Sequence, residues 1–77
     1  MISLYHTSGC HLCELAQAEL RLLGLDATLI DISDSAELVE ELGWLIPVLR
    51  HSSGAQLNWP FDAQQIEQWL SCQSQPQ

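Results

Sequence analysis

Residues 2–13, ISLYHTSGCHLC, decide the fold of this chain, because a short apolar run leads there into a pair of cysteines. The run at residues 2–6 has the length of a strand, and residues 7–9, Thr-Ser-Gly, are typical of a tight loop. Thr7 and Ser8 are the expected caps of a helix, and an amphipathic stretch follows at residues 14–23. The pattern therefore predicts a strand, a loop and a helix that begins at the cysteines.

Cys10 and Cys13 are three positions apart, which places both thiols on one face of the first helical turn. Their Cβ atoms would then lie about 5–6 Å apart. A disulfide requires roughly 3.8 Å, so a small local adjustment closes the bond. The positive end of the helix dipole also favours the thiolate, which is the reactive form of cysteine. Position and chemistry together predict a dithiol redox site.

The composition is that of one small and strongly acidic domain. Of 77 residues, 47% are hydrophobic, which is enough for a packed core. Ten acidic residues stand against two arginines and no lysine, so the formal net charge is −8. Binding to nucleic acid or to an anionic membrane requires clustered Lys and Arg, and we expect neither partner. A protein partner is expected to present a basic or neutral face.

The expected compartment follows from what the sequence lacks. No segment approaches the roughly 20 apolar residues that cross a bilayer, and residues 1–5 lack the basic start of a signal peptide. We therefore expect a cytoplasmic protein. In that reducing compartment a close cysteine pair is more often catalytic or metal-binding than structural. The third cysteine, Cys72, is expected to be buried or to lie at a fraying helix end.

Apolar runs and turn residues predict the remaining elements. We expect strands at residues 27–32, 47–50 and 55–58 and a helix at residues 35–42. A last helix follows Asp62, which is its expected N-cap. The inward-facing side chains of the first and last helices are expected to be Leu12, Leu15, Ala16, Leu20, Leu23, Ile66, Trp69 and Leu70.

The order of elements is thus β-α-β-α-β-β-α. The first two strands are expected to be parallel, because a helix joins them, and the last two antiparallel, because a tight turn joins them. This order predicts an α/β fold with a four-stranded mixed sheet flanked by helices. Residues 1–73 form one domain in this interpretation, and residues 74–77 form a frayed tail.

The element order, the Cys-x-x-Cys motif after the first strand, and Ile46-Pro47 before the third strand are similar to those of small glutaredoxin-like proteins of the thioredoxin fold. The resemblance implies that the Ile46–Pro47 bond is cis and that Pro47 faces the cysteines. It places Asp62 where glutathione-using relatives carry an acidic residue. Those relatives have a glycine pair before it, whereas this chain has the bulkier residues 59–61, Trp-Pro-Phe. We therefore expect glutathione to be only a weak co-substrate, and no tightly bound cofactor.

Each candidate residue has an expected role. Cys10, at the helix entrance, is the expected nucleophile, and Cys13, one turn inside on the stripe with Ala16 and Leu20, is the expected resolving thiol. His11, if protonated, would stabilise the Cys10 thiolate, and the alternative is an exposed histidine with a local effect only. The backbone of Ile46, turned by Pro47, is expected to clamp an extended substrate. Trp44 and Trp59 are expected to flank the substrate groove, and Trp69 to lie in the core.

Two functions of different classes fit these residues. The first is a monomeric thiol–disulfide oxidoreductase that contributes to cell redox homeostasis. It exchanges with protein or small-molecule disulfides, and an unidentified reductant restores its dithiol. The second is a metal or iron–sulfur carrier that uses Cys10. A zinc site would need further ligands at close spacing. The other candidates, His6, His11, His51 and Cys72, are not so spaced, and we expect no metal.

Overall fold

The computed structural model of the chain describes residues 2–74. The elements are β1 (Ile2–His6), α1 (His11–Leu22), β2 (Ala27–Asp31), the short 3₁₀ helix η1 (Ile32–Asp34), α2 (Ala36–Leu42), β3 (Val48–His51), β4 (Gln56–Asn58) and α3 (Ala63–Ser74). Every predicted helix and strand is present. The last helix continues to Ser74, and residues 75–77 of the predicted tail lie outside the described residues.

The four strands form one sheet in the order β2-β1-β3-β4. β1 is parallel to β2 and antiparallel to β3, and β3 is antiparallel to β4, so the predicted mixed sheet is confirmed. Leu4 at the centre of β1 lies opposite Leu29 of β2 and Leu49 of β3. Leu49 in turn lies opposite Leu57 of β4. A row of leucines therefore crosses the sheet on one face.

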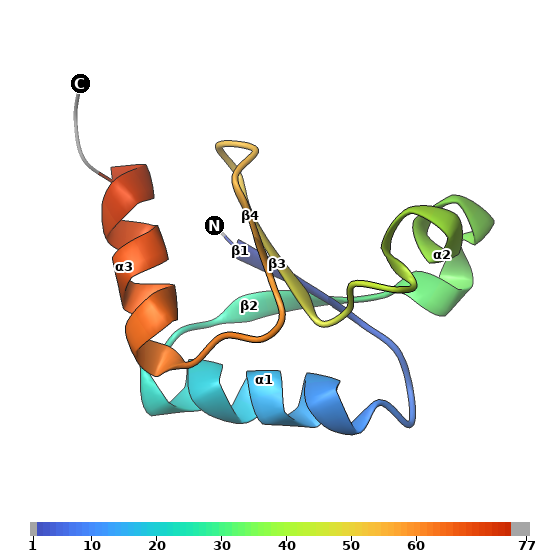
Figure 1. The fold of residues 1–77 in the computed structure, drawn as a ribbon, viewed down its shortest axis with the longest axis horizontal. Coiled ribbons are helices and arrows are strands. Elements are labelled where there is room, and N and C mark those ends of the chain that lie inside the picture. The colour runs from blue at the N-terminus through green and yellow to red at the C-terminus, as the bar shows by residue number, and fades with distance from the viewer. Residues whose placement is uncertain (1, 75–77) are drawn as a thin grey trace.

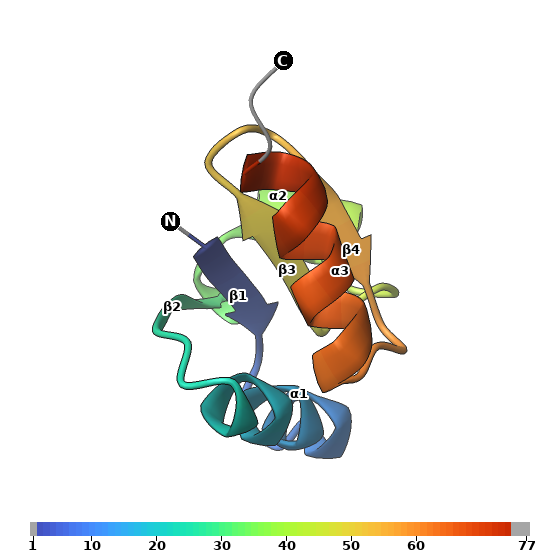
Figure 2. The ribbon, with the colours of Figure 1, turned by 90° about the vertical axis from the view of Figure 1, so that its left-hand side faces the viewer.

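Helices cover both faces of this sheet, with α1 and α3 on one face and α2 on the other (Figures 1 and 2). Alternate residues of a strand point to the same face, which is why Ile2 and Leu4 both enter the core under α1 and α3. The buried cluster there is Ile2, Leu4, Ala16, Leu20, Leu49, Phe61 and Ile66. Trp69 and Leu70 of α3 are half-buried and pack against this cluster.

The buried stripe of α1 differs in part from the predicted one. Cys13, Ala16 and Leu20 are buried, as their spacing of three and four residues predicts. Leu12 and Leu15, which were expected in the same stripe, are 43% and 41% exposed. Cys13 takes the inward position of the first turn, because a cysteine packs as a small hydrophobic side chain. The second cysteine of the pair is therefore anchored in the core.

Glycines and capping residues set the ends of these helices. Gly24 has a φ of +67° and its N–H donates to the Arg21 carbonyl, so α1 ends where the sequence predicts. The N-cap of α2 is Ser35, whose hydroxyl accepts the N–H of Leu38 at 3.3 Å. These ends fix the lengths of the connections that carry the candidate site.

Candidate active site

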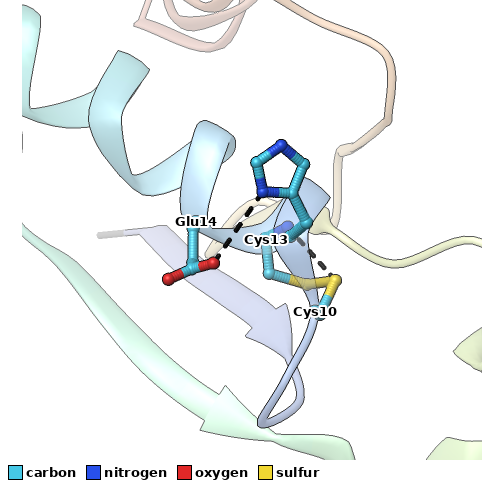
Figure 3. The surroundings of a disulfide bond; sticks show 4 residues. Cys10, Cys13 and Glu14 are labelled. Atoms are coloured by element: carbon cyan, nitrogen blue, oxygen red, sulfur yellow. Dashed lines mark hydrogen bonds and ion pairs between the residues drawn. A yellow bond between two sulfur atoms is a disulfide. The ribbon is translucent and has the colours of Figure 1, made fainter.

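Cys10 and Cys13 are joined by a disulfide at the start of α1, and their Cα atoms lie 5.2 Å apart (Figure 3). Gly9, with a φ of +75°, turns the chain just before Cys10. Cys10 itself is the N-cap of α1, and its sulfur accepts the N–H of Cys13 at 3.1 Å. The expected caps Thr7 and Ser8 are therefore wrong, because the cysteine sulfur fills the capping position.

The two cysteines differ in their exposure to solvent. Cys10 is half-buried, whereas Cys13 is 1% exposed and lies against the core side of α1. A molecule in solution can therefore reach Cys10 but not Cys13. In the reduced protein a thiolate at Cys10 would also receive the Cys13 N–H and the positive end of the helix dipole.

The strand register brings Pro47 and Trp59 to the edge of the sheet from which the cysteine loop departs. Tyr5 of β1 lies opposite Val48 of β3, so Pro47 continues β3 beside the end of β1. The N–H of Trp59 donates to the Pro47 carbonyl at 3.2 Å, which places Trp59 on the other side of Pro47. Pro47 is buried and its peptide bond with Ile46 is cis, as the resemblance implies. The Trp59–Pro60 bond is also cis.

The expected backbone clamp at Ile46 is wrong in one respect. The N–H of Ile46 donates to the Leu42 carbonyl at 3.0 Å, as the N–H of Leu45 also does at 2.8 Å. The turn that closes α2 therefore uses the donor that a substrate strand would have needed. This leaves the Ile46 carbonyl as the backbone group that could meet a substrate, as an acceptor only.

His11 lies on the outside of the first turn of α1. Its Nδ1 is 4.0 Å from a carboxylate oxygen of Glu14, and both side chains are exposed (Figure 3). Exposed ion pairs contribute little, because water and salt screen them. The structure thus agrees with the alternative of an exposed histidine, whose neighbour is a carboxylate.

Asp62 caps α3, as the sequence predicts, and Gln65 completes a reciprocal arrangement that was not predicted. Its Oδ1 accepts the N–H of Gln65 at 2.8 Å, and the Gln65 side-chain oxygen accepts the N–H of Asp62 at 3.1 Å. The sequence signal was present, because Asp-x-x-Gln at residues 62–65 matches a capping box. Trp59, which precedes this cap, is half-buried and meets the ring of Phe61 edge-on at 5.1 Å between centroids.

A polar cluster at the end of β2 lies beside the cysteine loop and was also missed. Asp31 is opposite His6 in the sheet, and its Oδ1 accepts the Ser33 hydroxyl at 2.8 Å and the Ser33 N–H at 3.0 Å. These two bonds hold the pKa of Asp31 below its usual value, and the Thr7 side chain and the charge of His6 lower it further.

Within residues 2–74, no group of three or more His, Cys, Asp or Glu side chains is arranged to hold a metal ion. In the same part of the chain, no helix is long and apolar enough to span a bilayer. Cys72 is free and exposed near the end of α3, so of its two expected placements the buried one is wrong and the one near the helix end remains.

The family of this chain is shown by comparison with known proteins. The family model of a glutaredoxin-like domain (DUF836) matches residues 1–71. The X-ray structure of the Northeast Structural Genomics target XcR50 from X. campestris is 37% identical, with a TM-score of 0.87 over 94% of this chain and 97% of that chain. The solution structure of XcR50 is 36% identical, with a TM-score of 0.84 over 92% of each chain.

A more distant structure, protein Ne2328 from Nitrosomonas europaea, is 27% identical, with a TM-score of 0.74 over 88% of this chain and 87% of that chain. No match was found among curated protein sequences. The matched region contains both cysteines of the disulfide, so this is a redox thiol protein. With its thioredoxin-like order of helices and strands, the chain belongs to the glutaredoxin-like domain family (DUF836).

Proposed function

We propose that the protein is a thiol–disulfide oxidoreductase in which Cys10 is the nucleophile and Cys13 the resolving thiol. The observation that carries this proposal is the unequal burial of a bonded pair, with Cys10 half-buried at a helix N-terminus and Cys13 1% exposed. A nucleophile must be reached by its substrate, whereas a resolving thiol only has to reach the nucleophile. The pair meets both requirements.

The exchange begins with the reduced protein. The Cys10 thiolate attacks one sulfur of a substrate disulfide, which forms a mixed disulfide and releases the other substrate sulfur as a thiolate. The Cys13 thiolate then attacks the Cys10 sulfur, forms the internal disulfide and releases the second substrate thiolate. Two electrons pass from the protein to the substrate, and the two thiol protons go to solvent and to the released thiolates. A separate thiol or dithiol reductant reverses these steps.

The residues around the pair have supporting roles in this proposal. Trp59 gives the substrate a rigid, largely apolar wall, because it is half-buried and meets Phe61 edge-on. The buried Pro47 supports this wall from below, since its carbonyl accepts the Trp59 N–H. The Ile46 carbonyl accepts a hydrogen bond from an extended substrate. His11 has a local effect only, because it is exposed and the Glu14 carboxylate lies 4.0 Å from its Nδ1.

Glutathione is a weak co-substrate in this proposal, and no cofactor is tightly bound. A glutathione carboxylate at the start of α3 would need free backbone N–H groups. The N–H of Asp62 is already donated to Gln65, and Pro60 has no N–H to give. The Asp62 carboxylate is also engaged, as the acceptor of the Gln65 N–H. Protein or small-molecule disulfides are therefore the better substrates.

The proposal also covers the setting of the reaction. A free, exposed thiol such as Cys72 suits a reducing compartment, and we place the protein in the cytoplasm as a monomer. The net charge of −8 argues against nucleic acid and anionic membranes as partners. The alternative function, a metal or iron–sulfur carrier, requires Cys10 alone and gives no role to a buried partner at Cys13.

Turnover of a small uncharged disulfide by the reduced protein tests the proposal. Wild-type protein should release two thiols per disulfide, and the Cys10→Ser variant none. Cys72→Ser is the matched control, because it removes an exposed thiol outside the pair, and it should retain wild-type turnover. Loss of turnover in Cys72→Ser, or its retention in Cys10→Ser, would refute the assignment. With glutathione as sole reductant, turnover should be slower than with a dithiol.

A further inference from the structure

Trp44 is the most exposed large hydrophobic side chain among the described residues, at 94% of its surface. It occupies the turn at residues 43–45 between α2 and β3, next to the exposed Leu45 and one helical turn beyond the exposed Val39. We call Val39, Trp44 and Leu45 the Trp44 surface. A tryptophan left in water forfeits the stabilisation of burial, and this residue type is enriched at the energetic centres of protein interfaces.

The turn that carries Trp44 is tied to α2 by three backbone hydrogen bonds. The N–H of Gly43 donates to the Val39 carbonyl at 2.9 Å, and the N–H groups of Leu45 and Ile46 both donate to the Leu42 carbonyl, at 2.8 and 3.0 Å. Three residues further on, Pro47 is buried. The indole is thus presented from a turn held at both ends, so a partner would meet a preformed apolar knob at little cost in backbone ordering.

The Trp44 surface and the cysteine pair belong to the same edge of the sheet. Val48 lies opposite Tyr5, so the connection from α2 enters β3 where β1 leaves toward Cys10. Figure 1 shows this connection and the loop from β1 to α1 on the same side of the molecule. A standard protein interface covers about 800 Å² per partner, a disc roughly 32 Å across. The Cα extents of the chain are 36 × 25 × 18 Å, so an interface of that size around Cys10 has the reach to include this turn.

The helix that leads into the Trp44 surface carries three exposed carboxylates and no cation. Glu41 and Glu40 lie three and four residues before Trp44, and Glu37 lies one turn earlier, all exposed on α2. Between Arg21 and Arg50 the sequence contains no basic residue. Arg50 is itself engaged, with its guanidinium over the Tyr5 ring. The apolar centre therefore has an acidic rim.

We propose that the Trp44 surface is the docking site for the redox partner, and that this partner presents a basic rim around an apolar hollow that receives the indole. This deepens the proposed function, because it names the class of protein disulfide that reaches Cys10. A second copy of the chain fits poorly, since two acidic rims would repel each other. Nucleic acid and anionic membranes carry the same sign of charge as the rim.

The probes are three synthetic peptides, each closed by one internal disulfide, that differ only in the residues beside their cysteines. These residues are Lys and Leu in the Lys–Leu peptide, Glu and Leu in the Glu–Leu peptide, and Lys and Ser in the Lys–Ser peptide. We measure kcat/KM for their reduction at low and high salt, and divide each value by the same variant's rate with a small uncharged disulfide. At low salt the Lys–Leu peptide should react at least tenfold faster than either other peptide. The Lys–Leu to Glu–Leu ratio should fall at high salt, because the screening length shortens to a few ångströms at 1 M.

Variants locate the effect on the surface. Trp44→Ala should lower the normalised rate with the Lys–Leu peptide about tenfold or more, as expected for an interface anchor. Glu40→Gln with Glu41→Gln should lower the Lys–Leu to Glu–Leu ratio about two- to fivefold per charge. Glu67→Gln is the matched control, because Glu67 is exposed on α3, which covers the opposite face of the sheet, and the ratio should not change (Figure 2).

The outcomes separate this inference from the proposed function. Equal normalised rates for the three peptides would overturn the docking site while the reduction of the small disulfide still supports the oxidoreductase. No reduction of any disulfide would overturn the oxidoreductase itself. A dimer that sedimentation detects in the wild type and not in Trp44→Ala would identify a second copy as the occupant, and would also overturn the proposed partner.

Discussion

Replacing Asp62 with alanine tests whether this residue is a helix cap, as the structure places it. The substitution removes the Oδ1 that accepts the Gln65 N–H at 2.8 Å and leaves that donor without its side-chain partner. Loss of an N-cap acceptor costs about 1 kcal/mol. In a domain of this size, 1 kcal/mol corresponds to about 4–8 °C in Tm. We therefore expect Asp62→Ala to unfold about 4–8 °C below the wild type.

The assay is thermal unfolding followed by circular dichroism at neutral pH, with the disulfide kept oxidised in every sample. Asp62→Asn is the matched variant, because its side-chain oxygen can still accept the Gln65 N–H while the charge is lost. The Tm of Asp62→Asn should fall by less than half as much as the Tm of Asp62→Ala. Asp62→Ala and wild type melting within 1 °C of each other would refute the capping role and return Asp62 to the list of candidate ligand-binding residues.

Three further predictions concern the core, the Asp31 cluster and the cysteines. Ile66→Val, which shortens a fully buried side chain, should lower the free energy of unfolding in urea by about 1 kcal/mol. Leu22→Ala, on the surface, should lower it by less than half of that amount. Asp31 has a lowered pKa in the folded state, so its charge stabilises the fold above the unfolded pKa of about 3.8, and this contribution is lost as pH falls through the folded pKa. The Tm difference between wild type and Asp31→Asn should accordingly be present at pH 6 and shrink on acidification below pH 3.8, and a pH-independent difference would count against it. In the reduced protein, alkylation should modify Cys10 faster than Cys13, with a rate that reaches half its maximum below the free-cysteine value of about pH 8.5; a faster Cys13 would show that burial does not protect it.

Most of the fold could be predicted from local patterns in the sequence. The short apolar run of β1, the glycine after α1 and the turn before β4 each identify an element from the sequence alone. The first helix begins at His11, between the two cysteines, as the pattern predicts, but its N-cap is Cys10 and not the expected hydroxyl of Thr7 or Ser8. A sulfur atom as N-cap is not among the usual capping signals, so the sequence pattern could not reveal it.

The candidate site was predictable in its chemistry and less so in its surroundings. Cys-x-x-Cys at a helix start predicts the disulfide directly, whereas the hydrogen bond that occupies the Ile46 N–H depends on how the turn after α2 closes. The same turn leaves Trp44 exposed, although a tryptophan near a buried proline is expected to be at least partly covered. Such features depend on tertiary placement of a short connection, and no local pattern encodes them.

Trapping of the reaction intermediate tests the central claim most directly. Reduced Cys13→Ser protein is mixed with a disulfide peptide, quenched with acid and mapped by mass spectrometry. The account predicts one peptide thiol bound to Cys10, whereas wild type should give an internal Cys10–Cys13 disulfide with a loss of two hydrogens and both peptide thiols free. An adduct on Cys72 in the variant, or reduced wild-type protein that does not convert the peptide, would contradict the account.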